Sequence, residues 1–136
     1  CSTRIIGAGN YTFTNTSAGT YMAHSTVTIT TGAKPLLVWW NAVFANDTLG
    51  GAVIIGPAVD GTMASPQTTT IGAVSVADPV ATRQMNMSGS FMIESVTAAT
   101  HTIGLKHWVD QGTSTNYCGG ANINFATCTI GVCEIK

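Results

Sequence analysis

The chain has 136 residues and a mass of 14.0 kDa, which is the size of one ordinary domain with its own core. Five basic and six acidic side chains give a net charge of -1, and charged residues make up only 8%. This composition excludes a basic surface for nucleic acid and a polybasic patch for anionic lipid. No apolar run reaches the roughly 18 residues that a membrane-spanning helix needs.

The residue types favour an all-β protein. Threonine is about one residue in six, whereas the strong helix formers Glu, Lys, Gln, Arg and Leu are scarce. Threonine and the β-branched apolar residues suit the half-buried surface of a pleated sheet. With 45% apolar residues, the chain is expected to fold rather than remain disordered.

Four strands are predicted in the first half of the chain. The pattern at residues 26–30 alternates cleanly, so that Val27 and Ile29 face inward and the threonines face outward. Residues 36–45 form the most apolar run, and the segment 52–59 ends at Asp60-Gly61, which is a strong hairpin-turn signal. The predicted strands are residues 11–14, 26–30, 36–45 and 52–59.

The second half begins with a long excursion, residues 62–83, which holds one short strand candidate at 71–76. Strands resume at residues 84–96 and 102–109, where every second side chain is apolar or a histidine. Residues 111–120 are predicted to be a polar loop, and 123–135 a closing strand with a bulge near 126–128. The inward-facing residues expected on the two middle strands are Met85, Met87, Phe91 and Ile93, and then Ile103, Leu105, His107 and Val109.

This succession of short strands, with turn residues between them, predicts one domain over residues 1–136. The expected architecture is an antiparallel β-sandwich of jelly-roll type with about 7–9 strands. No helix of convincing period and no internal repeat is visible in the sequence.

The four cysteines are Cys1, Cys118, Cys128 and Cys133. Their spacing fits no zinc motif, so two disulfides formed in an oxidising compartment are expected, with four buried thiols as the alternative. Cys128 and Cys133 stand roughly 16 Å apart on one strand, too far to bridge. The favoured pairs are Cys118 with Cys128, across a hairpin, and Cys1 with Cys133. A chain that begins at Cys1 is expected to be processed or a fragment. A lipidated Cys1 is disfavoured because it leaves an odd thiol.

No arrangement of residues indicates catalysis, a cofactor or a metal ion. The carboxylates are dispersed, and Asp60 and Asp78 fit turns. His101 and His107 lie six residues apart on one strand, about 20 Å, so one ion cannot bridge them. The protein is therefore expected not to be an enzyme. The groups considered are Asp47, Asp60, Asp78, Glu94, Asp110 and Glu134, and His24, His101 and His107.

The tryptophans and the strand 36–45 point to a binding surface. Trp39 and Trp40 are adjacent on one strand and must point to opposite faces. Both faces of that strand are apolar, so Leu37, Trp39 and Val43 are predicted to meet a neighbouring subunit, unless residues 62–83 cover them. Trp108, with Lys106 beside it, is a candidate contact for a glycan or receptor, and subunit packing is the favoured alternative.

The second half of the chain resembles the TNF-like jelly-roll heads of tailed-phage fibre and virion-surface (decoration) proteins. Residues 58–62 are similar to the "VDGT" turn of that group and residues 88–93 to its "SGSF" strand. Residues 97–105 resemble its "L-x-A-G-x-H-T-I-x-L" hairpin, and 130–135 its closing strand. Thr100 replaces the usual turn glycine, and the cysteine cluster is atypical.

The resemblance implies a non-enzymatic, trimeric structural protein on a virion surface, a capsid decoration or a tail-fibre head, that is extracellular. Its expected partners are its own copies, other virion proteins and a host-surface glycan or receptor; nucleic acid and membrane insertion are not expected. Two other functions remain open. One is a subunit of an extracellular filament or pilus joined by strand donation, and the other is a secreted carbohydrate-binding module.

Overall fold

A computed structural model describes residues 1–5, 11–14, 21–48, 51–63, 73–75, 85–94, 96–116 and 128–135. All the regular structure in these residues is strand, which confirms the all-β prediction. The strands are β1 (Ser2–Ile5), β2 (Tyr11–Phe13), β3 (Tyr21–Thr30), β4 (Leu36–Asn46), β5 (Ala52–Val59), β6 (Thr62–Met63), β7 (Ala73–Ser75), β8 (Met85–Ile93), β9 (Thr100–Val109), β10 (Ser114–Asn116) and β11 (Thr129–Glu134).

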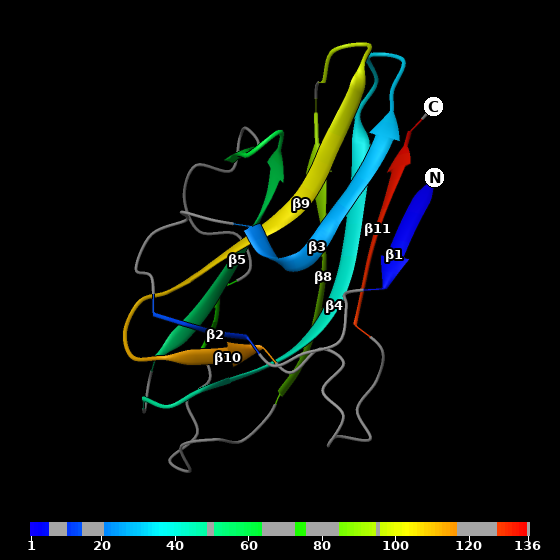
Figure 1. The fold of residues 1–136 in the computed structure, drawn as a ribbon. Coiled ribbons are helices and arrows are strands. Elements are labelled where there is room, and N and C mark those ends of the chain that lie inside the picture. Colours follow the sequence, from blue (N-terminus) through cyan, green and yellow to red (C-terminus); the bar gives the residue numbers. More distant parts are fainter. Residues whose placement is uncertain are drawn as a thin grey trace.

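The strands form two antiparallel sheets that pack face to face (Figure 1). In the first sheet the order is β1-β11-β4, with β8 on the other side of β4, and β10 and β2 continue beside the end of β4. In the second sheet the order is β3-β9-β5, with β6 and β7 pairing to β5. Eight of these strands thus form two four-stranded layers, β1-β11-β4-β8 and β3-β9-β5-β7, and this is the strand order of a jelly roll. The predicted β-sandwich is confirmed.

The core lies between the two sheets and is built from every second residue of the long strands. β4 contributes Leu36, Val38, Trp40 and Phe44, and none of these side chains is more than 4% exposed. The predicted inward faces are confirmed where the structure describes the side chains. These buried residues include Val27 on β3, Met87, Phe91 and Ile93 on β8, and Ile103, Leu105, His107 and Val109 on β9.

The turn at Asp60-Gly61 follows its local chemistry. Val59 pairs with Thr62, so the hairpin loop between β5 and β6 has two residues. Asp60 has φ 49° and Gly61 has φ 86°, and positive φ at both central positions is what the tight hairpin turn requires. The sequence signal for this turn is confirmed.

The predicted polar loop at residues 111–120 is wrong in part, because β10 lies within it. Ser114, Thr115 and Asn116 pair with β4 on one side and β2 on the other. Asp47 positions this strand, since its Oδ1 accepts a hydrogen bond of 2.7 Å from the Thr113 amide. The buried Ser114 hydroxyl donates to the carbonyl of Ala45 at 2.8 Å. The segment therefore forms a strand, although its residue types are typical of turns, because hydrogen bonds to neighbouring strands stabilise it.

The first strand was also not predicted. β1 pairs antiparallel with β11, from Ser2 opposite Val132 to Ile5 opposite Thr129. It brings the N-terminal end of the chain beside the C-terminal strand, as Figure 1 shows in blue and red. Other expectations fall on residues outside the described ranges, namely most of the excursion 62–83, the bulge near 126–128 and the side chain of His24.

Candidate functional site

The described residues hold no compact cluster of reactive groups. In the ranges that the structure covers, no three His, Cys, Asp or Glu side chains converge where they could hold a metal ion. None of the described segments forms a helix long and apolar enough to cross a membrane. The candidate site is instead sought on the surface of the sandwich, at the outward face of β4, where the sequence predicts a binding surface.

The outward face of the first sheet has no charged side chain among its described members. Leu37 on β4 stands opposite Met92 on β8 and Cys133 on β11, and Trp39 stands opposite Ser90 and Gly131. Met92 is 47% exposed, and Leu37 and Trp39 are half-buried. We call these three residues, Leu37, Trp39 and Met92, the apolar patch. Its polar surround consists of Thr3, Asn41, Ser88, Ser90 and Thr129.

Trp39 is held in place by a glycine on the neighbouring strand. A Cβ atom added at Gly131 would collide with the Trp39 indole, whose Nε1 lies only 2.7 Å from that position. The ring therefore lies over the backbone of β11, where only a glycine leaves room for it. On the inner face, Trp40 lies in the same way over Gly89 of β8, where an added Cβ atom would be 3.1 Å from the Trp40 ring. Adjacent tryptophans thus rest on glycines of opposite neighbouring strands.

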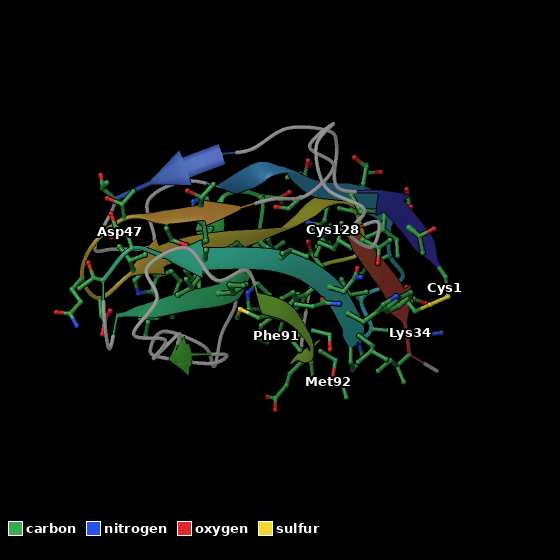
Figure 2. All side chains as sticks on the ribbon, turned by 90° about the horizontal axis from the view of Figure 1, so that it is seen from below. Cys1, Lys34, Asp47, Phe91, Met92 and Cys128 are labelled. Carbon is green, nitrogen blue, oxygen red and sulfur yellow. A yellow bond between two sulfur atoms is a disulfide. The ribbon has the colours of Figure 1, made fainter. Side chains whose placement is uncertain are left out.

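One end of the apolar patch is closed by a disulfide. Cys133, which is bonded to Cys1, stands opposite Leu37 in the register of the sheet. The yellow bond in Figure 2 lies at the opposite end of the molecule from Asp47. Cys128 is disulfide-bonded as well, and no cysteine within the described ranges is free. Cys118, its expected partner, lies outside the described residues.

One predicted interface position needs correction. Val43 is only 2% exposed in a single chain, so it is already covered and cannot lie at the contact with a neighbour. Its neighbour on the same face, Ala45, is likewise buried at 4%. The outward face of β4 is thus accessible at Leu37 and Trp39 and closed at the other end of the strand.

The pairing of Trp108 with Lys106 as a glycan or receptor contact also needs correction. Lys106 is only 8% exposed, although its side chain is on the face of β9 that points away from the core. Gly56 lies opposite Lys106 on one side and Tyr21 on the other. Trp108 is half-buried, and its ring lies near Gly56, which Met63 covers. A lysine buried in this way is not available to a ligand, so Lys106 does not belong to the predicted contact, whereas the contact through Trp108 stays a prediction.

A second group of polar residues lies at one end of the sandwich. Nδ1 of His101 donates to Oδ2 of Asp60 at 2.7 Å, and Nε2 lies 3.0 Å from the Thr97 carbonyl and 3.2 Å from the Thr97 hydroxyl. The other Asp60 oxygen accepts from the Thr102 amide at 2.8 Å. Thr31 donates its hydroxyl to the same Thr97 carbonyl at 2.7 Å. We call Thr31, Asp60, Thr97, His101 and Thr102 the end network.

The end network perturbs the titration of both charged partners. The hydrogen bond that His101 donates to Asp60, followed by that to the Thr97 carbonyl, raises the pKa of His101 above its usual 6.5. The same bond to His101, together with the Thr102 amide, lowers the pKa of Asp60. His107 differs because burial alone lowers its pKa to about 4. The pKa values of the two histidines of β9 are thus shifted in opposite directions from 6.5.

Sequence reasoning found Leu37 and Trp39 but missed Met92, Gly131 and the end network. Gly131 gains its role only when β11 pairs with β4 in a register that places it opposite Trp39. The Asp60 turn and the segment around His101 were both noted in the sequence as parts of the resemblance to virion-surface heads. Asp60 and His101 are 41 residues apart in the sequence, and no local sequence pattern indicates that they are in contact. The sequence matches no protein-family model and no curated protein.

Proposed function

We propose that this protein is a non-enzymatic structural protein of a virion surface, a capsid decoration or a tail-fibre head, that works as a homotrimer. The observation that carries the proposal is the apolar patch: Leu37, Trp39 and Met92 stand side by side on an uncharged sheet face. Aromatic residues and methionine are enriched at protein interfaces, whereas Lys, Glu and Asp are depleted there. The resemblance of residues 58–62, 88–93 and 97–105 to virion-surface heads supports the virion assignment.

The polar residues around the apolar patch also support a contact with another protein. Ser88 and Ser90 are exposed on β8, and Thr3 is exposed on β1, so hydroxyl groups border the central apolar side chains. An apolar centre with a polar rim is the usual anatomy of an interface. Tryptophan is the residue type most enriched among positions that dominate binding energy. Trp39, already immobilised over Gly131, loses little conformational entropy when a neighbour covers it.

The filament alternative is less well supported. Subunits that join by strand donation give an edge strand to a neighbouring sheet. β1 is such an edge strand, but it pairs with β11 of its own chain, and the Cys1–Cys133 disulfide ties it there. A donated β1 would have to break that bond.

A carbohydrate-binding module is the second candidate function. Trp39 is half-buried over Gly131, and Asn41, Ser90 and Thr129 lie around it. A flat aromatic face beside hydroxyl and amide groups suits a sugar ring, because the apolar side of the sugar stacks and its edge forms hydrogen bonds. In this case the ligand, rather than a second copy, would cover Trp39.

Light scattering coupled to size exclusion separates these functions. A closed trimer supports the structural proposal, an open polymer supports the filament, and a monomer supports the carbohydrate module. For the monomer outcome, quenching of Trp39 fluorescence by a panel of neutral oligosaccharides would identify the sugar, with Trp39→Ala as the variant that abolishes it. A virion partner would be sought by adding the purified protein to phage particles that lack it.

A further inference from the structure

The end network joins three connections that are distant in the chain. Asp60 belongs to the turn between β5 and β6, Thr97 precedes β9, and Thr31 follows β3. Besides the side-chain bonds already described, the Thr31 amide donates to the Ala99 carbonyl, and the Asp60 amide donates to the Thr102 carbonyl, both at 2.9 Å. His101 is the only member whose side chain contacts both Asp60 and Thr97. Its ring therefore links the two halves of the network.

The two sides of the imidazole ring meet different kinds of partner. An ionised carboxylate only accepts hydrogen bonds, so Nδ1 must carry a proton to bind Asp60. At Nε2 the ring meets both a carbonyl, which only accepts, and the Thr97 hydroxyl, which can donate. A protonated ring donates from Nε2 to the carbonyl of Thr97. A neutral ring accepts from the hydroxyl of Thr97 and leaves that carbonyl to Thr31.

From this geometry we propose that Asp60, His101 and Thr97 form a proton-operated latch, which fastens this end of the sandwich more tightly when His101 is charged. The proton that Nε2 gains comes from solvent, and Asp60, with its side chain 54% exposed, keeps the site in contact with water. In the charged state the ring makes two charge-assisted bonds, which are about twice as strong as neutral ones. In the neutral state the ring still donates from Nδ1 to Asp60, but Nε2 can only accept, so the bond to the Thr97 carbonyl is lost.

Other charged groups on the packed elements lie away from the ring. Lys106 is five residues along β9 and faces the opposite side of the sheet, and His107 is six residues along, at roughly 20 Å. Lys34, in the connection after β3, pairs with Glu134 on β11 at 3.6 Å. The remaining charged side chain on a described neighbouring segment is Glu94, which is exposed. Asp60 is the one carboxylate within hydrogen-bond distance of His101 in the described residues.

The proposal predicts opposite effects for two substitutions. Asp60→Asn removes the negative charge but suits the positive φ of this turn, because Asn-Gly is a preferred pair there; the pKa of His101 should fall towards its ordinary value. Thr97→Val removes the hydroxyl that serves the neutral ring but keeps the carbonyl, so the pKa of His101 should rise further. Thr97→Ser, which retains the hydroxyl, is the matched control and should leave it unchanged.

The measurement is an NMR titration of the His101 ring in the folded protein, with amide exchange of Thr102 and Thr31 followed over the same pH range. We expect a pKa above 6.5 in the native protein, the ordering Thr97→Val above native above Asp60→Asn, and loss of amide protection as pH rises through the native pKa. Equal pKa values in Thr97→Val and Thr97→Ser, or amide protection that is independent of the charge on His101, would overturn the proposal.

Discussion

Trp39 lies across Gly131, the residue directly opposite it on the neighbouring strand, and its indole occupies the space that a side chain at position 131 would need. This contact fixes a large aromatic side chain on an outward sheet face and leaves it only half-buried. Because the ring is held by its own chain, it is ready for a partner before any partner arrives. The proposed assembly depends on this arrangement.

Replacing Gly131 by Ala should displace Trp39 and destabilise the fold. Adding one methyl group in a packed contact typically costs about 1–3 kcal/mol, and the ring has to leave the added Cβ atom. Urea unfolding of Gly131→Ala, Trp39→Ala and the double variant measures this coupling. Gly131→Ala should be costly in the native background and nearly neutral once Trp39 is gone. An equal cost in both backgrounds would show that the two residues do not interact.

The Cys1–Cys133 disulfide should contribute strongly to stability, because it spans a sequence separation of 132 residues. In the chain-entropy model a loop of this size corresponds to about 5 kcal/mol, and the disulfide at Cys128 reduces that value by already constraining the unfolded chain. The double variant Cys1→Ser/Cys133→Ser should therefore unfold at much lower urea concentration than the native protein. Replacing both cysteines, rather than one, leaves no unpaired thiol from this disulfide.

Intact mass after alkylation without reduction tests the cysteines directly. The native protein should take up no label, since both disulfides protect their thiols. Four alkylated cysteines would contradict the predicted pairing of Cys118 with Cys128 and the observed pairing of Cys1 with Cys133.

His107 should make the protein sensitive to mild acid. Burial lowers its pKa from 6.5 to about 4, so between these values the unfolded chain binds a proton that the folded chain does not. The contribution of neutral His107 is therefore fully present above pH 6.5 and is lost as pH falls towards 4, by up to about 3 kcal/mol. Urea unfolding of the native protein and His107→Leu at several pH values isolates this effect. A stability difference between them that does not change with pH would contradict it.

The parts of the fold that the sequence predicted correctly are those that depend on local chemistry. Val27 and Ile29 alternate with threonines, so the faces of β3 follow from the period of two that any strand has. The turn at Asp60-Gly61 follows because few other residues accept positive φ at both positions. Such signals need no knowledge of which strand lies alongside.

The parts that were missed depend on pairing between distant strands. Ser114 to Asn116 are polar enough for a loop, yet they form a strand because β4 and β2 lie on both sides of them. Lys106 was expected at the surface, but it stands between Gly56 and Tyr21 of the neighbouring strands and is only 8% exposed. Val43 was expected at an interface because both faces of β4 are apolar. It is instead covered by other residues of the same chain. In each case the decisive neighbour is far away in sequence.

Met92→Asp is the substitution that tests the apolar patch with least risk to the fold. Met92 is 47% exposed, so a charge there stays hydrated in a single chain but would be desolvated, without a partner, in an assembly. Thr28→Asp is the matched control, because it places the same charge on an exposed position of the other sheet. Circular dichroism should show both variants folded.

The central claim is that copies of this chain associate through Leu37, Trp39 and Met92, and the mass in solution tests it most directly. Size exclusion with light scattering at micromolar concentration should give three times the mass of one chain for the native protein and for Thr28→Asp. Met92→Asp should give the mass of a single chain. A native protein that runs as a monomer, or a Met92→Asp variant that keeps the native mass, would contradict the account.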